Sequence, residues 1–333
     1  MKRVLIILSF FAAVSLSGCW PARLLVSNIG ESITEEPQKV NKPGNPVHDS
    51  VKVSVLMIGH SSTLVQIYDK VIIFDPFFNK RFGGVLLRRT EPGINLDSLH
   101  QLDAVFVSHS HMDHLSFSSL DILFSKFPKS KLVFPEGLEY YLPDFGVDMF
   151  RIEKTDTDSK RFIGKPVFVS GMKVTPVYAY HSGGRYAFDT YAWKEEGVTG
   201  FIIEYKDVCF YYAGDTGYHD KAFKYIGEKF DIGVSLVPIG PCRNCDSTGF
   251  WHHTSSIEAL DLFKDIKADY MIPVHYGTVR YFTDENKPLQ VLNNLVDSLT
   301  VYKPLKDMII PLKPGEQKIW KLNGAAVINT KTP

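Results

Sequence analysis

The feature that most constrains the fold of this chain is a short segment in which three histidines and an aspartate follow an apolar run of strand character. Segment 107–114 reads VSHSHMDH. Alternate side chains of an extended backbone share a face, so His109 and His111 can bind one metal ion together. A turn in the middle of the segment would direct Asp113 and His114 toward a second ion. Because the chain has only 11 histidines in 333 residues, we interpret the cluster as metal ligands rather than as a histidine-rich loop.

Three further candidate ligands stand where predicted strands run into loops, namely His181, Asp215 and His275. Strand ends are rigid platforms for ligands. Gly214 also allows the backbone to turn sharply just before Asp215. A histidine taken alone is more often structural than a ligand, but the recurrence of such residues beside the cluster favours one shared site.

The candidate ligands divide between two ions. The division is His109, His111 and His181 for one ion, Asp113, His114 and His275 for the other, and Asp215 for both. Two ions about 3.5 to 4 Å apart would lower the pKa of a bridging water toward roughly 7. The set therefore predicts hydrolysis by a metal-bridging hydroxide, with Asp113 and Asp215 in catalytic as well as ligand roles.

The first residues have the pattern of an export signal. Lys2 and Arg3 precede an apolar run over 4–14 that is too short for a comfortable transmembrane helix, and small residues then lead to Cys19. This resembles a bacterial lipoprotein signal, in which residues 1–18 would be removed and Cys19 would receive lipid. An ordinary secretory peptide is the alternative. Both predict export, and lipidation predicts an extracytoplasmic, membrane-anchored lipoprotein in the periplasm or at the outer membrane.

Composition divides the rest of the chain and narrows its partners. Residues 19–50 mix prolines with polar residues and lack a sustained apolar period, which predicts a flexible tether after the lipidated cysteine. The chain has 37 Lys plus Arg residues and 37 Asp plus Glu residues. Because the formal net charge is zero, there is no overall positive charge that would attract nucleic acid. The spacing of Cys242 and Cys245 permits a disulfide in an oxidising compartment, and two free thiols are the alternative.

Strands and helices are interleaved in both halves of the domain. Strands are predicted at 51–57, 63–68, 71–74, 102–106, 131–134, 166–180 (two strands), 198–205, 208–212, 232–238, 270–274 and 317–322. Helices are predicted at 116–127, 221–230, 255–264 and 289–299. This order fits two mixed sheets covered by helices.

The motifs resemble those of the metallo-β-lactamase superfamily, whose H-x-H-x-D-H signature stands at 109–114 and whose later ligands match His181, Asp215 and His275 in order. The finer resemblance, over about 52–299, is to the branch of the N-acylphosphatidylethanolamine-hydrolysing phospholipase D and the ascorbate-phosphate lactonases. It rests on GHSS (59–62), FDP (74–76), AGDTGY (213–218), VPIG (237–240), HYGT (275–278) and His253 followed by Glu258-Ala259. Arg185, four positions after His181, favours the phospholipase side.

The resemblance implies an α/β fold, an αββα sandwich of two mixed sheets flanked by helices, as one hydrolase domain over 51–333. It also implies two zinc ions, with another divalent metal such as manganese as the alternative, and a homodimer is compatible with it. The chain departs from the family pattern at two places. Segment 182–184 (SGG) replaces the tryptophan that commonly follows the histidine matching His181, and the loop with Cys242 and Cys245 has no counterpart.

Four side chains outside the ligand set are candidates for contacts with the ligands or the substrate. Asp75 is placed to accept a hydrogen bond from a ligating imidazole, although a turn-forming aspartate before proline is equally consistent with its position. His60 and His253 could donate to a substrate phosphate or to a leaving oxygen, and Arg185 could hold an anionic headgroup. Segment 255–258 also predicts a helix capping box, which gives the region around His253 a structural role as well.

These features predict a membrane-tethered, zinc-dependent phosphodiesterase of phospholipase D type, which would act on a phospholipid such as an N-acylated phosphatidylethanolamine. A lactonase or other metal-dependent hydrolase of a soluble phosphorylated metabolite is the alternative, because the same hydroxide can attack an acyl carbon. Di-iron redox chemistry is disfavoured, since family branches that use iron for it favour a carboxylate at the position of His111. A passive metal-binding or lipid-binding protein would have little use for the complete set of carboxylates and imidazoles.

Overall fold

The computed structural model describes residues 35–84, 86–153, 162–185, 189, 197–249, 252–281 and 284–322. The predicted signal peptide and the predicted lipidation site at Cys19 lie outside these described residues. Within the described part of the chain, no helix combines the length and the apolar character that crossing a bilayer requires.

The first of two large sheets has seven strands in the order β15-β1-β2-β3-β6-β7-β8. Their bounds are β1 Val51–Gly59, β2 Ser62–Ile67, β3 Lys70–Phe74, β6 Ala104–Phe106, β7 Lys131–Pro135, β8 Met149–Ile152 and β15 Gln317–Lys321. Pairing is antiparallel from β15 to β3 and parallel from β3 to β8. A separate short hairpin, β4 (Arg81–Phe82) and β5 (Leu86–Leu87), follows β3.

The second sheet has six strands in the order β14-β13-β12-β11-β10-β9. Their bounds are β9 Val167–Val169, β10 Met172–Val177, β11 Gly200–Tyr205, β12 Val208–Tyr212, β13 Val234–Pro238 and β14 Tyr270–Val274. Strands β9 to β12 pair antiparallel, whereas β12, β13 and β14 are parallel. Both sheets are therefore mixed.

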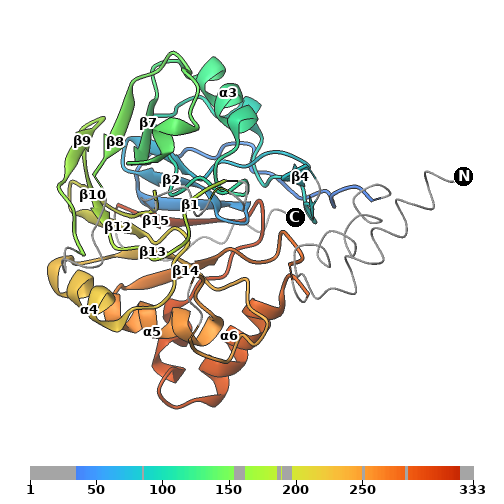
Figure 1. Cartoon of the computed structure of the whole chain (residues 1–333), viewed down its shortest axis with the longest axis vertical. Helices are drawn as coiled ribbons and strands as arrows, with labels where there is room; N and C mark the ends of the chain where they lie inside the picture. The colour runs from blue at the N-terminus through green and yellow to red at the C-terminus, as the bar shows by residue number, and fades with distance from the viewer. Residues whose placement is uncertain are drawn as a thin grey trace, which may run out of the picture.

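In the described part of the chain, four α-helices cover the outer faces of the two sheets, with α3 on the first and the other three on the second (Figure 1). They are α3 Phe117–Lys126, α4 Asp220–Lys229, α5 Ser256–Ile266 and α6 Lys287–Ser298. Short 3-10 helices lie at Leu96–Ser98, Leu138–Tyr140 and Lys303–Met308. The predicted αββα sandwich is confirmed.

The core between the sheets follows from the two-residue period of the strands. In β1, Val53, Val55 and Met57 point into the space between the sheets, whereas Leu56 and Ile58 face the layer of α3. A group of buried aromatic residues fills the inner layer, including Phe74, Phe106, Phe201, Phe210 and Tyr212. Each fully buried aromatic side chain contributes roughly 1.5–3 kcal/mol to stability, so this layer holds the two sheets together.

Most predicted elements agree with the structure to within a few residues. The exceptions are β8 and the β4–β5 hairpin, which were not predicted. Strand β8 has one buried residue in four and each hairpin strand has only two residues, so neither has enough apolar alternation to be recognised.

The described part of the predicted tether, 35–50, makes defined contacts with the domain. Gln38 and Thr90 form an isolated β-bridge, and the Gln317 side-chain amide donates to the Pro46 carbonyl across 2.8 Å. The His48 amide also donates to Gln66 Oε1 at 2.9 Å, and Gln66 Nε2 donates to the His48 carbonyl at 2.8 Å. Hydrogen bonds therefore connect this polar segment to strands of the first sheet.

Candidate metal centre

The candidate ligands gather where six strands end. Strands β1, β3 and β6 run in one direction within the first sheet, and β10, β12 and β14 do so within the second. Their carboxyl ends therefore meet at one edge of each sheet. The residues that follow these ends are His60, Asp75, the segment from Val107, His181, Asp215 and His275.

The histidine-rich segment leaves the sheet in an extended form and then makes one turn. The Val107 amide still bonds to the Val133 carbonyl of β7 across 2.9 Å. The carbonyl of His111 then accepts hydrogen bonds from the amides of His114 and Leu115 at 3.0 and 2.8 Å. This turn brings Asp113 and His114 back to the cluster, as the spacing of the segment predicted.

Several site residues occupy the left-handed backbone region, which costs about 1–3 kcal/mol for a residue other than glycine. Their φ angles are 61° at His60, 40° at Asp75 and 63° at His275. Gly214 has φ 62°, and a Cβ there would lie 2.9 Å from the Cβ of Ser108. Glycine thus allows Asp215 to follow β12 next to the histidine-rich segment.

Among the described residues, four overlapping groups of side chains present ligand atoms that lie within 4.8 Å of one another, and two of these groups contain no residue in common. The first is His109, His111 and His181, and the second is His60, Asp113, His114 and His275. Apart from His60, these groups are the two ligand sets predicted from the sequence.

Asp215 lies between the two groups. Its Oδ2 atom is 3.1 Å from His275 Nε2 and 3.2 Å from His114 Nε2. The same oxygen is 3.9 Å from both His109 Nε2 and His181 Nε2. One carboxylate therefore reaches both groups, which is the arrangement expected of a bridging ligand.

The donor atoms fit divalent metal ions. His109 Nε2, His114 Nε2, His275 Nε2 and Asp215 Oδ1 are buried and have no aligned hydrogen-bond partner. Buried polar atoms normally have such a partner, and imidazole nitrogens with carboxylate oxygens are the ligands that zinc and similar metals take. A cluster of unpartnered nitrogens around a carboxylate is therefore a site for metal.

Electrostatics keep most of the cluster in a metal-binding protonation state. Burial lowers the pKa of His109 and His181 well below the usual range, which keeps both rings neutral. Burial opposes ionisation of Asp215, but the adjacent His114 and His275 outweigh it and hold the carboxyl pKa well below its usual range. Although burial opposes its protonation, Asp215 and Asp113 raise the pKa of His275 to about 9. Metal binding would therefore release a proton there.

Asp75 orients one of the candidate ligands. Its Oδ2 atom accepts from His114 Nδ1 at 2.6 Å, from the Ser108 hydroxyl at 2.6 Å and from the Tyr212 hydroxyl at 2.5 Å. The Ser108 amide donates to Oδ1 at 2.7 Å. This is the contact expected for Asp75 from the sequence, and it leaves His114 Nε2 free to face the cluster. Tyr212 and Ser108 were missed, because no sequence signal pairs residues that are distant along the chain.

The other group of candidate ligands, which contains His181, is oriented by the segment that follows residue 251. His181 Nδ1 donates to the His252 carbonyl across 2.5 Å, which fixes the tautomer of this ring. A backbone carbonyl has no sequence signal, so this role of His252 was also missed. His253 lies at the rim, where its side chain is 26% exposed and its Nδ1 is 3.5 Å from Asp215 Oδ2.

Two predicted substrate contacts need correction. The His60 side chain is 1% exposed, and its Nε2 bonds to Asp113 Oδ2 at 3.0 Å, so it supports a ligand instead of reaching a substrate. The Arg185 guanidinium donates to the carbonyls of Ser110 and Leu115 at 2.8 and 2.9 Å. These contacts lie on either side of the turn in the histidine-rich segment, whereas the sequence predicted a contact with an anionic headgroup.

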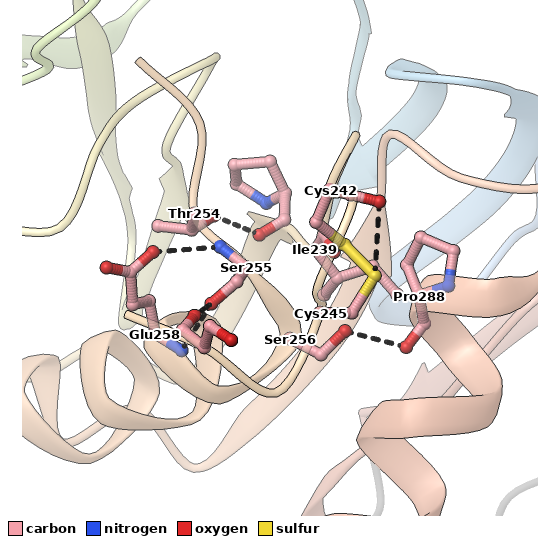
Figure 2. Close-up of a disulfide and its surroundings, with 10 residues drawn as sticks. Ile239, Cys242, Cys245, Thr254, Ser255, Ser256, Glu258 and Pro288 are labelled. Carbon is pink, nitrogen blue, oxygen red and sulfur yellow. Dashed lines mark hydrogen bonds between the residues drawn. A yellow bond between two sulfur atoms is a disulfide. The ribbon is translucent and has the colours of Figure 1, made fainter. Parts of the chain in front are cut away.

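The loop that precedes His252 is braced by a disulfide. Cys242 and Cys245 are bonded and buried, which decides between the two alternatives left open by the sequence. Figure 2 shows this bond beside the first turn of α5, where the Ser256 hydroxyl donates to the Pro288 carbonyl of α6 at 2.7 Å. The predicted capping box between Ser255 and Glu258 is also present.

Comparison with known proteins agrees with this architecture. Residues 70–276 match the family model described as "Beta-lactamase superfamily domain". The chain is 28% identical to N-acyl-phosphatidylethanolamine-hydrolyzing phospholipase D 1 of Caenorhabditis elegans, over 91% of this chain and 89% of that protein. It is 27% identical to a UPF0173 metal-dependent hydrolase of Staphylothermus marinus, over 78% of this chain and 95% of the other.

Among solved structures, the chain is similar to Igni18, a metallo hydrolase of the archaeon Ignicoccus hospitalis. The TM-score is 0.58 at 22% identity, covering 81% of this chain and 99% of that chain. This likeness supports the fold alone. With the fold, the cluster and the family match taken together, the chain belongs to the metallo-β-lactamase superfamily and is a metal-dependent hydrolase.

Proposed function

We propose that this protein is a membrane-tethered, zinc-dependent phosphodiesterase of phospholipase D type. The observation that carries the proposal is the position of Asp215 Oδ2 between two groups of buried donor atoms. The proposed ligands are His109, His111 and His181 for one ion, Asp113, His114 and His275 for the other, and Asp215 for both. Two such ions would generate hydroxide from water near neutral pH and neutralise charge on a phosphodiester.

The side chains around the ions have separate tasks in this proposal. Asp75 holds His114 in the tautomer whose Nε2 faces the ion. His253 stands at the rim, where it can donate a hydrogen bond to a phosphate oxygen or to the leaving oxygen. Burial lowers the pKa of His253 to about 3, so the ring acts as a neutral donor.

The proposed substrate is an N-acylated phosphatidylethanolamine. Hydrolysis would break the bond between phosphorus and the ethanolamine oxygen, giving phosphatidic acid and an N-acylethanolamine. Support comes from the similarity to the Caenorhabditis elegans enzyme, which extends over 91% of this chain. A lipid attached to Cys19 would hold the domain at a membrane surface, where a phospholipid substrate is found.

The test is to incubate the zinc-loaded protein with vesicles containing N-acylated phosphatidylethanolamine in ¹⁸O-labelled water. Both products are expected by mass spectrometry, with ¹⁸O in phosphatidic acid only. Asp215→Asn should lower the rate by at least 10²-fold, as the loss of a main electrostatic group does, while the exposed control Asp231→Asn leaves it unchanged. Intact lipid despite a full metal content would contradict the proposal.

The second candidate is a lactonase or other hydrolase of a soluble phosphorylated metabolite. It is favoured by the similarity to the UPF0173 protein of Staphylothermus marinus, which is named only as a metal-dependent hydrolase. Phosphorylated lactones assayed beside the vesicles separate the two. If the protein hydrolysed a lactone but no phosphodiester, the lactonase function would replace the phosphodiesterase function proposed above.

A further inference from the structure

We infer that Tyr281 is a positioning residue for Asp113, and through Asp113 for one of the two metal ions. This inference rests on the ligand assignment of the proposed function and is independent of the substrate. The Tyr281 hydroxyl donates to Asp113 Oδ2 across 2.7 Å. That oxygen also lies 3.6 Å from His275 Nε2 and 3.8 Å from His114 Nε2. The phenol therefore bonds to the carboxylate oxygen that faces the other ligands of the same ion.

The direction of this hydrogen bond follows from two distances. The Tyr281 oxygen is 2.7 Å from Asp113 Oδ2 but 3.5 Å from His60 Nε2. A hydrogen bond of 2.7 Å to a charged acceptor is stronger than one of 3.5 Å to a neutral ring. The single phenolic proton is thus directed to Asp113.

His60 supplies the second donor to the same oxygen. Its Nε2 lies 3.0 Å from Asp113 Oδ2, while its Nδ1 is buried without a partner. A proton on Nδ1 would be a buried donor without an acceptor, so the proton belongs on Nε2. Asp113 Oδ2 is therefore held by two donors, one after β1 and one after β14.

The Tyr281 ring is fixed by packing that does not involve its hydroxyl. It contacts a cluster formed by Phe77, Phe82 and Val279, and it lines a small cavity together with Cys242 of the disulfide loop. Phenylalanine has the same ring, so Tyr281→Phe removes the hydroxyl and keeps this packing.

Partners of ligating carboxylates tune metal affinity, and their loss typically costs 10–100-fold. Titration of metal-free protein with Zn²⁺, followed by competition with a chelator, measures both affinities without any turnover. Tyr281→Phe is expected to weaken one of the two ions about 10–100-fold and to leave the other unchanged. The matched control is Tyr276→Phe, because this hydroxyl donates to the Leu312 carbonyl at 3.1 Å and not to the cluster.

A double-variant cycle distinguishes positioning from packing. If Tyr281 acts through Asp113, adding Tyr281→Phe to Asp113→Asn should cause no further loss of zinc affinity. Wild-type affinities in Tyr281→Phe would overturn the inference, and so would a loss of equal size in the Asp113→Asn background. If phospholipids stay intact while the expected affinity pattern is found, the proposed substrate is wrong and the role of Tyr281 stands.

Discussion

At the scale of single residues, buried charge explains much of the geometry around the cluster. Arg88 is fully buried and donates to the carbonyls of Ile58, Phe77 and Thr90 at 2.7–2.8 Å. Burial lowers the pKa of its guanidinium to about 9. Because a Cβ at position 59 would lie 2.4 Å from Arg88 Nη2, that position has to be glycine. Arg88 thus joins the segments that carry His60 and Asp75.

Asp75→Asn should weaken zinc binding about 10–100-fold. It should also lower the free energy of unfolding by about 3 kcal/mol or more, because an amide nitrogen would face buried donors and leave a charged partner uncompensated. Urea unfolding and zinc titration measure the two effects. The exposed Asp121→Asn serves as the control, and a variant indistinguishable from it would show that Asp75 is only a turn residue.

At the scale of elements, the start of α5 sets the position of the loop that carries His252 and His253. The Ser255 hydroxyl donates to the Ser247 carbonyl at 2.6 Å, and Glu258 accepts from the amides of Gly249 and Ser255. The helix cap and the loop are therefore one unit. The position of this unit therefore sets the position of the His252 carbonyl, which accepts the hydrogen bond from His181 Nδ1.

Ser255→Ala is expected to lower the free energy of unfolding by about 1 kcal/mol, the usual cost of losing an N-cap. It should also weaken zinc binding, since the carbonyl that orients His181 belongs to the same unit. Denaturant unfolding and zinc titration measure the two effects. The control is Ser125→Ala, at an exposed position of α3. If Ser255→Ala lowered stability but left the zinc affinity unchanged, the helix cap would have no role in positioning the metal ligands.

At the scale of the whole molecule, the site joins the two sheets. Asp113 and His114 follow a strand of the first sheet, whereas His181, Asp215 and His275 follow strands of the second. A ligand that binds only the folded state stabilises it. Metal binding should therefore stabilise the sandwich as a unit.

Zinc at 100 times its dissociation constant should add about 2.7 kcal/mol per bound ion to the free energy of unfolding. Thermal unfolding before and after chelation measures this difference, with metal content determined on the same samples. Equal transition temperatures for samples with and without bound zinc would mean that the ions do not connect the two sheets.

The metal-free protein should be most stable near pH 6.5. The pKa of His60 is lowered from 6.5 to about 3 by burial. Its contribution to stability is present above pH 6.5 and is lost as the pH falls toward 3. The raised pKa of His275, about 9, works in the opposite direction. Its contribution is present below pH 6.5 and is lost as the pH rises through 9. Urea midpoints measured between pH 3 and pH 9 check both losses, and a midpoint independent of pH would contradict them.

The sequence by itself determined the order of most strands and helices and the three segments that supply later ligands, and the αββα class followed from the family that its motifs resemble. These follow from apolar periodicity and from short motifs, which are local properties of the chain. The tertiary structure alone decided that Asp113 receives hydrogen bonds from His60 and Tyr281, that Tyr212 bonds to Asp75 and that Arg185 faces backbone carbonyls. Those contacts join residues far apart in sequence, and their distances depend on how two sheets pack against each other, which no local pattern encodes.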